Sequence, residues 1–242
     1  MGTLGWIIPP PRRPRKTRGQ LRGERAERVR RLMEEGLLNS GALVEAMMRV
    51  PREEFIPEEY RDYAYLEVPL PIPGRGSTIS CPHSYPLFYE ALGLDRGDSF
   101  LEVGTGSGYG AALAYEVVGA MGRVVTVEID EETYRFAKRN LERLGYTKIH
   151  VILGDGSKGY PPLAPYDKIA VTASCPSIPE PLIQQLNPGG RLIAPVGPAD
   201  YPQDLILVEK ELNGSIRSKK IDEVLYIPLR GEYGWRARTY RV

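Results

Sequence analysis

The 242-residue sequence contains only two cysteines, Cys81 and Cys175, and only two histidines, His83 and His150. Two cysteines cannot build the disulfide framework that holds a small secreted domain together. No pair among these four residues has the spacing of a structural zinc site, so we expect no metal centre. A single disulfide between the two cysteines is not excluded, although a reducing compartment disfavours it.

Long hydrophobic runs are also missing. No apolar stretch reaches the roughly 18 to 20 residues that a membrane-spanning helix requires. The short apolar stretch Trp6-Ile7-Ile8 is followed at once by prolines and arginines, which is unlike a secretory signal. With 42% hydrophobic and 26% charged residues, the chain has the composition of a globular protein with a sizeable core. We therefore expect a cytoplasmic protein that does not interact with membranes.

Positive charge is concentrated near the amino terminus, although the formal net charge is only +1. Between Arg12 and Arg31, ten cationic side chains face only Glu24 and Glu27. Such a stretch can be an arm that binds a polyanion. It lacks interleaved aromatic residues on which bases would stack, so we do not expect nucleic-acid binding. We predict a basic, proline-rich tail over residues 1–20 and a single domain over residues 21–242.

Hydrophobic periodicity predicts strands that alternate with helices along most of the chain. Helices are expected from Leu21 onward and over residues 42–50, and loops with short elements over residues 51–76. The predicted strands are 99–103, 123–128, 149–153, 167–171 and 191–196, and the helices between them are 107–118, 131–144 and 179–186. Residues 205–211 and 216–225 flank Asn213-Gly214, which is typical of an antiparallel hairpin. The pattern predicts an α/β fold: a doubly wound, mostly parallel sheet with N-terminal helices and an antiparallel C-terminal hairpin.

A glycine-rich loop, Gly104-Thr105-Gly106-Ser107-Gly108, joins the first predicted strand to its helix. Ligands of doubly wound sheets bind at this kind of turn, where glycine lets the backbone approach them closely. A nicotinamide or flavin dinucleotide is one candidate ligand. The spacing Gly106-x-Gly108-x-x-Ala111 fits the dinucleotide pattern formally, so the glycines alone leave the ligand open.

Acidic residues stand at the ends of three successive predicted strands. Glu102 precedes the glycine loop, where it would repel a pyrophosphate but suits the cationic methionine end of S-adenosylmethionine. Glu128 can accept both ribose hydroxyls of either cofactor. Asp155, between Gly154 and Gly156, can accept the adenine amine, or it can simply form a turn. The three acids together favour S-adenosylmethionine.

Several separate segments, in an order that spans roughly residues 25–235, resemble the protein-L-isoaspartate O-methyltransferase family. These segments are 50–57 (VPREEFIP), 78–83 (TISCPH), the glycine loop, 154–160 (GDGSKGY), 178–197 and 227–229 (IPL). The resemblance implies a Rossmann-like class I methyltransferase. It also implies transfer of a methyl group from S-adenosylmethionine to the free α-carboxylate of L-isoaspartyl residues in damaged proteins and peptides. The ester would then close spontaneously to a succinimide, as a step of protein repair.

The resemblance assigns Ser80 to the active site, close to the reacting carboxylate. A carboxylate is already ionised at neutral pH and needs no base, so catalysis requires placement of the two reactants. We therefore expect Ser80 to hold the carboxylate and not to act as a nucleophile. Without the resemblance, Ser80 and His83 could equally cap the helix expected around residues 87–92. The predicted cofactor-binding residues are Thr78, Ile79, Ser80, His83, Glu102, Gly104, Gly106, Glu128, Ile129, Asp155 and Gly156.

The sequence departs from the family pattern at two places of interest. Cys81 stands where the family usually has an apolar or amide residue, so the shape of the peptide pocket is open. Arg230 replaces a residue that is often small or hydroxylated, and it can lie at the surface or pair with a substrate carboxylate. An alternative function is methylation of RNA or a small molecule. Against amine methylation, residues 172–176 (TASCP) occupy the place of the usual Asn/Asp-Pro-Pro-aromatic motif.

Overall fold

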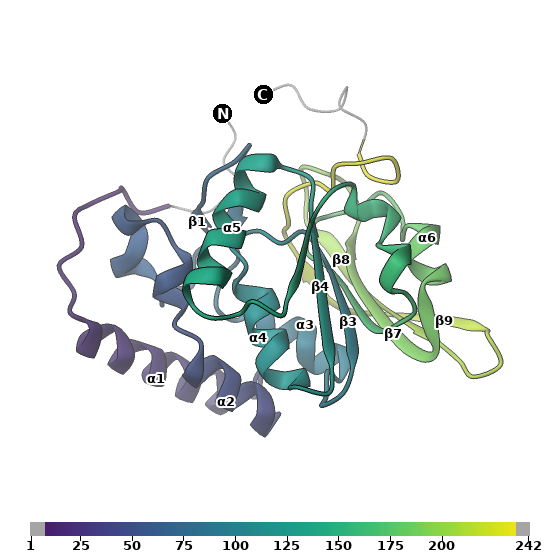
Figure 1. The fold of residues 1–242 in the computed structure, drawn as a ribbon, viewed down its shortest axis with the longest axis horizontal. Coiled ribbons are helices and arrows are strands. Elements are labelled where there is room, and N and C mark those ends of the chain that lie inside the picture. The colour runs from purple at the N-terminus through teal and green to yellow at the C-terminus, as the bar shows by residue number, and fades with distance from the viewer. Residues whose placement is uncertain (1–7, 236–242) are drawn as a thin grey trace.

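The computed structural model describes residues 8–235, which are built around a seven-stranded sheet (Figure 1). In space the strands follow the order β5-β4-β3-β6-β7-β8-β9. Their bounds are β3 Ser99–Val103, β4 Arg123–Glu128, β5 His150–Leu153, β6 Tyr166–Val171, β7 Leu186–Val196, β8 Gln203–Lys210 and β9 Ile216–Val224. The strands from β5 to β7 pair in parallel, whereas β7–β8 and β8–β9 pair antiparallel. The predicted doubly wound sheet with an antiparallel hairpin is confirmed.

The order of the strands creates one switch point. From β3 the chain moves outward to β4 and β5, then returns to the other side of β3 to form β6 and β7. Connections after β3 and β6 therefore leave in opposite directions, which opens a crevice beyond the carboxyl ends of these two strands. The glycine loop follows β3 directly, so the fold places it at this crevice.

Both faces of the sheet are buried, as a doubly wound sheet requires. Neighbouring residues on one strand belong to different cores: Phe100 packs with one hydrophobic cluster and Leu101 with the other. The first cluster contains residues of the helices α2 (Gly41–Arg49), α3 (Ser84–Leu92) and α4 (Tyr109–Val118), and the second contains Leu182 of α6 (Glu180–Gln184). Because successive side chains on a strand point to opposite faces, this alternation gives each layer its own apolar surface.

Helices cover the sheet, and the N-terminal helices lie outside this covering layer (Figure 1). The bounds of the helices are α1 Arg18–Glu34, α2 Gly41–Arg49, α3 Ser84–Leu92, α4 Tyr109–Val118, α5 Glu131–Arg143 and α6 Glu180–Gln184. Short 3-10 helices occur at η1 Arg52–Phe55, η2 Glu58–Tyr63, η3 Gly156–Lys158 and η4 Pro161–Leu163, and β1 Leu70–Pro71 pairs with β2 Thr78–Ile79. Within residues 8–235, no helix has the length and apolar character needed to cross a membrane.

Helix α1 begins at Arg18, three residues before the expected start at Leu21. The cause is Thr17, whose side chain accepts from the backbone N–H of Gln20 while Gln20 caps Thr17 in return. Leu32 is buried, whereas its apolar neighbour Met33 is 48% exposed. Successive helix residues are rotated by about 100°, so the two cannot share one narrow apolar stripe.

Residues 10–16 lie along η2. The carboxylate of Asp62, which is 1% exposed, accepts from the backbone N–H groups of Arg15 (2.9 Å) and Lys16 (3.1 Å). The Arg12 guanidinium lies 3.2 Å from the same carboxylate. These contacts fix the chain directly before α1, whereas the division into a tail and a domain at residue 20 stays a prediction.

Strand β7 begins earlier than its predicted start at residue 191. Tyr166 pairs with Leu186 and Lys168 pairs with Arg191, so residues 187–190 bulge out of the ladder. Gly189 takes a φ of +81°, which permits the bulge. The sequence Pro188-Gly189-Gly190, which predicts a turn ahead of the strand, is therefore an irregularity inside it.

Candidate active site

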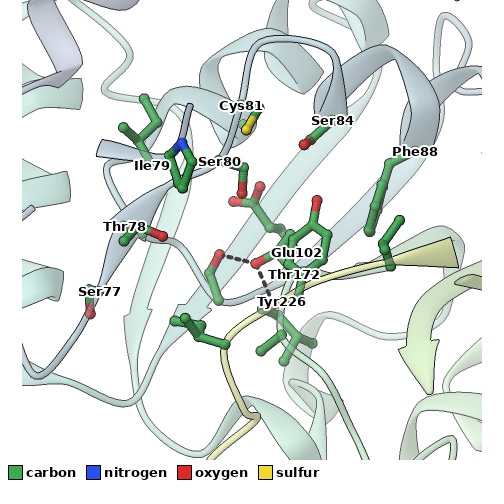
Figure 2. A pocket seen from close by; sticks show the side chains of 18 of the residues that line it. Ser77, Thr78, Ile79, Ser80, Cys81, Ser84, Phe88, Glu102, Thr172 and Tyr226 are labelled. Atoms are coloured by element: carbon green, nitrogen blue, oxygen red, sulfur yellow. Dashed lines mark hydrogen bonds between the residues drawn. The ribbon is translucent and has the colours of Figure 1, made fainter. Parts of the chain in front are cut away.

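A cavity of about 1020 Å³ opens at the carboxyl ends of β3, β4 and β6 (Figure 2). Three distant parts of the chain line most of it: the segment from β2 into α3, the glycine loop with the start of α4, and residues 222–230, which include the end of β9 and the segment after it. Every predicted cofactor-binding residue except Asp155 lines this cavity. The position agrees with the rule that ligands of such sheets bind at the switch point.

The glycine loop requires Gly104 for steric reasons. Its φ is +97°, and a Cβ there would lie 2.5 Å from Oγ1 of Thr172. Thr172 follows β6 and donates a hydrogen bond of 2.8 Å to the carbonyl of Gly104. The two strands on either side of the switch point are therefore tied together at the floor of the cavity.

Glu102 is 2% exposed near the end of β3 and lines the cavity. One carboxylate oxygen accepts from Oγ1 of Thr126 at 2.8 Å, and a Cβ on Gly110 would lie 2.2 Å from the other. The pKa of Glu102 is raised to about 8, chiefly by burial; the hydrogen bond from Thr126 opposes this shift and the nearby anion Glu128 adds to it. A cation bound beside Glu102 would favour its ionised form.

Glu128 ends β4 and is 6% exposed. Its carboxylate accepts from the backbone N–H groups of Gly106 (3.1 Å) and Asp130 (3.0 Å). Burial raises its pKa, and these hydrogen bonds oppose that shift. Ile129 follows and is 38% exposed at the cavity wall. Together they place a carboxylate and an apolar side chain at neighbouring points of the rim.

Asp155 does not line the cavity, although its neighbour Gly156 does. Its carboxylate accepts from N–H and Oγ of Ser157, at 3.0 and 2.6 Å, and so caps η3. It also accepts from the N–H of Glu232 at 2.9 Å, which fastens the C-terminal segment. The structure thus shows the turn-forming role, and the adenine contact stays a prediction.

Strand β2 brings Thr78, Ile79 and Ser80 against the glycine loop. A Cβ on Gly106 would lie 3.7 Å from the carbonyl oxygen of Thr78. The carbonyl of Ser80 accepts from Nη2 of Arg52 at 2.7 Å, and Arg52 is 1% exposed. Ser80 is not the cap of α3, because the N-cap position belongs to His83. The predicted acceptor residue and the predicted cofactor loop therefore share one cavity.

His83 does not cap α3 with its side chain. Its ring Nδ1 lies 2.6 Å from Oε2 of Glu67, in the loop before β1. Cys81 is 5% exposed and lines the cavity, and burial raises the pKa of its thiol to about 11. Cys175 is fully buried, and its thiol donates to the carbonyl of Pro195 at 3.3 Å. Both cysteines are free, so the disulfide that the sequence left open is not formed.

Comparison with known proteins shows to which protein family the chain belongs. A family model described as Protein-L-isoaspartate(D-aspartate) O-methyltransferase matches residues 24–234. The protein-L-isoaspartate O-methyltransferase 2 of Archaeoglobus fulgidus is 48% identical over 217 residues, covering 90% of this chain and 98% of the relative. The protein-L-isoaspartate O-methyltransferase of Hyperthermus butylicus is 49% identical over 223 residues, covering 89% and 92%. The chain belongs to the protein-L-isoaspartate O-methyltransferase family.

Solved structures agree with this membership. A protein-L-isoaspartate O-methyltransferase structure superposes with a TM-score of 0.78 at 35% identity, covering 87% of this chain and 67% of that one. A Plasmodium falciparum structure described as a protein-L-isoaspartate O-methyltransferase, in complex with S-adenosyl-L-homocysteine, gives a TM-score of 0.75 at 25% identity. It covers 85% of this chain and 98% of that one. The resemblance inferred from the sequence motifs is confirmed.

Several residues at this methyltransferase cavity were not among the predicted site residues. Thr172 closes the floor, and its place at a strand end next to the switch point is a signal that sequence reasoning could have used. Tyr226 lines the opposite wall, next to the hydroxyls of Ser80 and Ser84, and burial raises the pKa of its phenol. Its segment is placed by a bridge between Ser174 and Pro228, a pairing too distant in sequence to be read locally.

Arg230 lies at the rim of the same cavity. Its guanidinium is 38% exposed and lies 3.2 Å from the carboxylate of Asp130. The sequence left open whether this arginine is a surface residue or a partner for a substrate carboxylate. In the structure its partner is a carboxylate of the chain itself, directly after β4.

Proposed function

We propose that this chain methylates the free α-carboxylate of L-isoaspartyl residues in damaged proteins and peptides, with Ser80 as the residue that holds the acceptor. One observation carries the proposal: the Thr78–Ser80 segment lies directly on the glycine loop, inside the cavity that contains Glu102 and Glu128. Acceptor and methyl donor can therefore meet there. The alternative acceptors, RNA and small molecules, have no comparable support from the cavity or the family.

The residues present fit S-adenosylmethionine. A Cβ at Gly104 would lie 2.5 Å from Oγ1 of Thr172, so glycine is what lets the loop backbone pack closely at this end of the cavity. Of the described residues, the charged neighbour that acts on Glu102 is Glu128, another anion, so this end of the cavity favours a cation. The bound cofactor supplies a sulfonium methyl group, and S-adenosylhomocysteine is its product.

The chain contributes placement to the reaction. We assign Glu102 to the cationic end of the cofactor, Glu128 to the ribose, and the backbone from Thr78 to Ser80 to the boundary between cofactor and acceptor. The Ser80 hydroxyl donates to one oxygen of the substrate carboxylate and aims the other at the methyl carbon. The bound cofactor would supply the methyl group that this oxygen receives, and the electron pair of the former carbon–sulfur bond would stay on the sulfur of S-adenosylhomocysteine. No proton transfer is needed, since the carboxylate is already ionised.

The methyl ester then closes to a succinimide without further help from the protein. Attack of the adjacent backbone nitrogen expels methanol, and hydrolysis of the ring restores part of the normal aspartyl linkage. We place this repair in the cytoplasm, a reducing compartment that keeps Cys81 and Cys175 as thiols.

The decisive assay uses methyl-labelled cofactor with an isoaspartyl peptide and its normal aspartyl twin. We expect base-labile label on the isoaspartyl peptide alone, because a carboxyl methyl ester hydrolyses in base. Label on both peptides would show a different carboxylate specificity, and label on neither would refute the proposal.

Replacement of Ser80 tests the assigned role. A hydrogen bond to a charged group contributes about 1.5–3 kcal/mol, so Ser80→Ala should lower kcat by about 10- to 100-fold. The cofactor Kd, measured by calorimetry, should change by less than about threefold. Ser218→Ala on the exposed strand β9 is the matched control and should match the wild type. A Ser80→Ala enzyme with normal kcat and weakened cofactor binding would contradict the assignment.

A further inference from the structure

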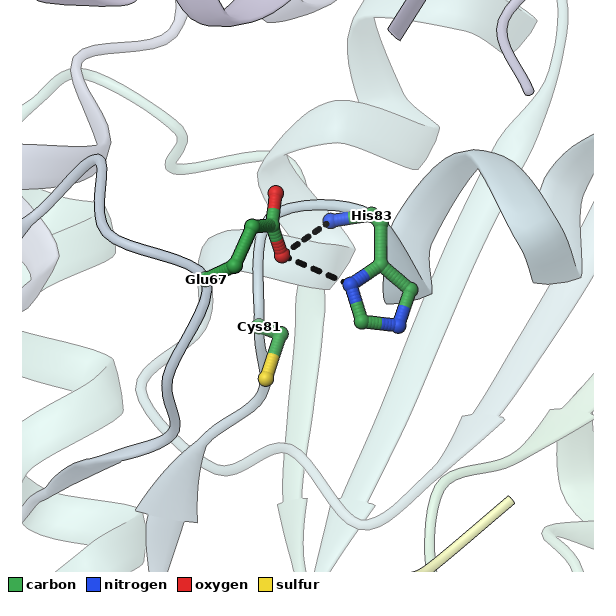
Figure 3. A group of neighbouring side chains, drawn as sticks. All are labelled: Glu67, Cys81 and His83. Atoms are coloured by element: carbon green, nitrogen blue, oxygen red, sulfur yellow. Dashed lines mark hydrogen bonds and ion pairs between the residues drawn. The ribbon is translucent and has the colours of Figure 1, made fainter. Parts of the chain in front are cut away.

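Three potential metal ligands from two separate segments meet beside the methyl-transfer cavity (Figure 3). Glu67 lies in the loop before β1, Cys81 follows β2, and His83 precedes α3. One ligand atom from each, a carboxylate oxygen, a thiol sulfur and an imidazole nitrogen, all lie within 4.8 Å of one another. Sequence reasoning found no metal site because it compared only cysteines and histidines, and Glu67 completes the group.

The environment already orients these side chains. Oε2 of Glu67 accepts from the backbone N–H of His83 at 3.4 Å and lies 2.6 Å from its Nδ1. The other oxygen, Oε1, lies 3.1 Å from the Arg28 guanidinium. A carboxylate held through one oxygen, with the second oxygen aimed at a histidine, resembles the outer support that metal-ligating carboxylates usually have. Cys81 and His83 both line the cavity, so the side facing the cavity is open.

We propose that Glu67, Cys81 and His83 form a binding site for a thiophilic divalent cation of the Zn²⁺ and Cd²⁺ class, and that its occupancy inhibits methyl transfer. Sulfur, nitrogen and oxygen ligands together select Zn²⁺ or Cd²⁺ over Mg²⁺ and Ca²⁺, which prefer oxygen alone. Three protein ligands leave a fourth position for water or a substrate carboxylate.

The movement required is small. With zinc bonds of about 2.0–2.1 Å to nitrogen or oxygen and about 2.3 Å to sulfur, tetrahedral ligands lie about 3.3–3.6 Å apart. The Glu67–His83 pair, now at 2.6 Å, must open by less than about 1 Å, and the sulfur must approach from within the 4.8 Å limit. On binding, the Cys81 thiol releases its proton to solvent, and the ring proton of His83 resides on Nε2 while Nδ1 binds the metal.

The inhibitory part rests on the proposed function, since it requires Ser80 to hold the acceptor. Cys81 follows Ser80 directly, and His83 begins the turn that leads into α3. A cation held at this wall would fix the Thr78–His83 segment and would attract the substrate carboxylate away from Ser80. Metal binding itself does not depend on the reaction and can be measured without any substrate.

The binding test uses the full chain after removal of metals with a chelator. Cd²⁺ titration should give a thiolate-to-metal charge-transfer absorption that saturates at one equivalent. Cys81→Ala should abolish this absorption, and Glu67→Gln should weaken Cd²⁺ affinity by at least about tenfold. Cys175→Ala is the matched control. This second buried thiol donates a hydrogen bond to the carbonyl of Pro195, so its removal should leave the titration unchanged. An absorption that survives in Cys81→Ala, or disappears in Cys175→Ala, would overturn the site.

The second readout is turnover on the isoaspartyl peptide. Stoichiometric Zn²⁺ should inhibit the wild type and the Cys175→Ala variant, and chelator should restore both. Cys81→Ala, compared with its own metal-free rate, should resist the same concentration. Cd²⁺ bound at Cys81 with unchanged turnover would overturn the inhibitory part alone. A metal titration that succeeds with an enzyme unable to methylate any peptide would instead overturn the proposed function.

Discussion

Glu102 is a carboxyl group that the fold buries beside another carboxyl group, Glu128. Burial raises its pKa from an ordinary 4.5 to about 8, so between these two pH values the folded chain binds a proton that the unfolded chain has lost. Stability therefore falls as pH rises through this window. Buried ionisable groups that reduce stability in this way are typical of functional sites, where a bound ligand of opposite charge compensates for the loss.

Replacement of Glu102 by glutamine should remove this pH dependence. Without cofactor, Glu102→Gln should gain stability relative to wild type progressively from about pH 5 to about pH 8, because the neutral amide cannot ionise. Thermal unfolding across this range measures the difference. Glu142→Gln, on the exposed surface of α5, is the control and should show no such trend. An equal difference at every pH would mean that Glu102 is ionised in the folded protein.

Arg52 is a second buried charge, and it supports the acceptor segment from behind. Its Nε donates to the carbonyl of Ala64 and its Nη2 to that of Ser80, at 2.6 and 2.7 Å. The guanidinium also lies 5.4 Å from the ring centre of Tyr109. Because an ammonium cannot reproduce this fork of donors, exchange for lysine removes the geometry while keeping the charge.

Arg52→Lys should therefore lower kcat about tenfold, because Ser80 loses the hydrogen bond that holds its backbone. The cofactor Kd should stay within about twofold of the wild-type value, because the glycine loop is unchanged. Arg123→Lys is the matched control. Arg123 also donates to a backbone carbonyl, that of Leu163 at 2.7 Å. It lies at the start of β4, at the edge of the sheet opposite to the cavity. The Arg123→Lys variant should lose about as much stability as Arg52→Lys, but it should keep the kcat of the wild type. Equal losses of kcat in both variants would reduce Arg52 to a purely structural role.

At the scale of elements, the sequence predicted the bounds of all strands of the large sheet within two residues, except for the early start of β7. The strands at residues 99–103 and 123–128 were predicted with their final bounds, because each is a short apolar run between clear turn signals. The bulge at residues 187–190 was missed, since Pro188 and Gly189 look like a turn unless the pairing with β6 is known. Pairing across distant strands is not encoded locally.

The candidate site shows the same division. Glu102, Gly104 and Glu128 could be predicted because their positions relative to a strand end determine where they lie. Asp155 satisfied the same rule, yet its carboxylate caps η3 and holds Glu232, a partner 77 residues away. Tyr226 could not be found from spacing, because its place follows from how the chain returns over the sheet after β9.

At the scale of the whole molecule, the cavity joins parts of the chain that are otherwise far apart. Residues before the sheet, residues at its centre and residues after its last strand form the three walls. A ligand that touches all three binds only the folded state and must therefore stabilise it. The increase is RT ln(1 + [L]/Kd), about 2.7 kcal/mol at a ligand concentration one hundred times Kd.

S-adenosylhomocysteine at that concentration should raise the Tm of the wild type by about 5–10 °C, given about 2–4 °C per kcal/mol for a domain of this size. Gly104→Ala should lose most of this increase, because its Cβ would meet Thr172 at 2.5 Å with φ at +97°. Gly214→Ala is the matched control: its φ is +85°, but no atom lies within 4 Å of its Cβ. Both variants carry similar backbone strain and should have lower starting Tm values, since a positive φ disfavours any side chain. Only Gly104→Ala should lose the response to ligand, and an equal response in the two variants would place the cofactor somewhere other than the glycine loop.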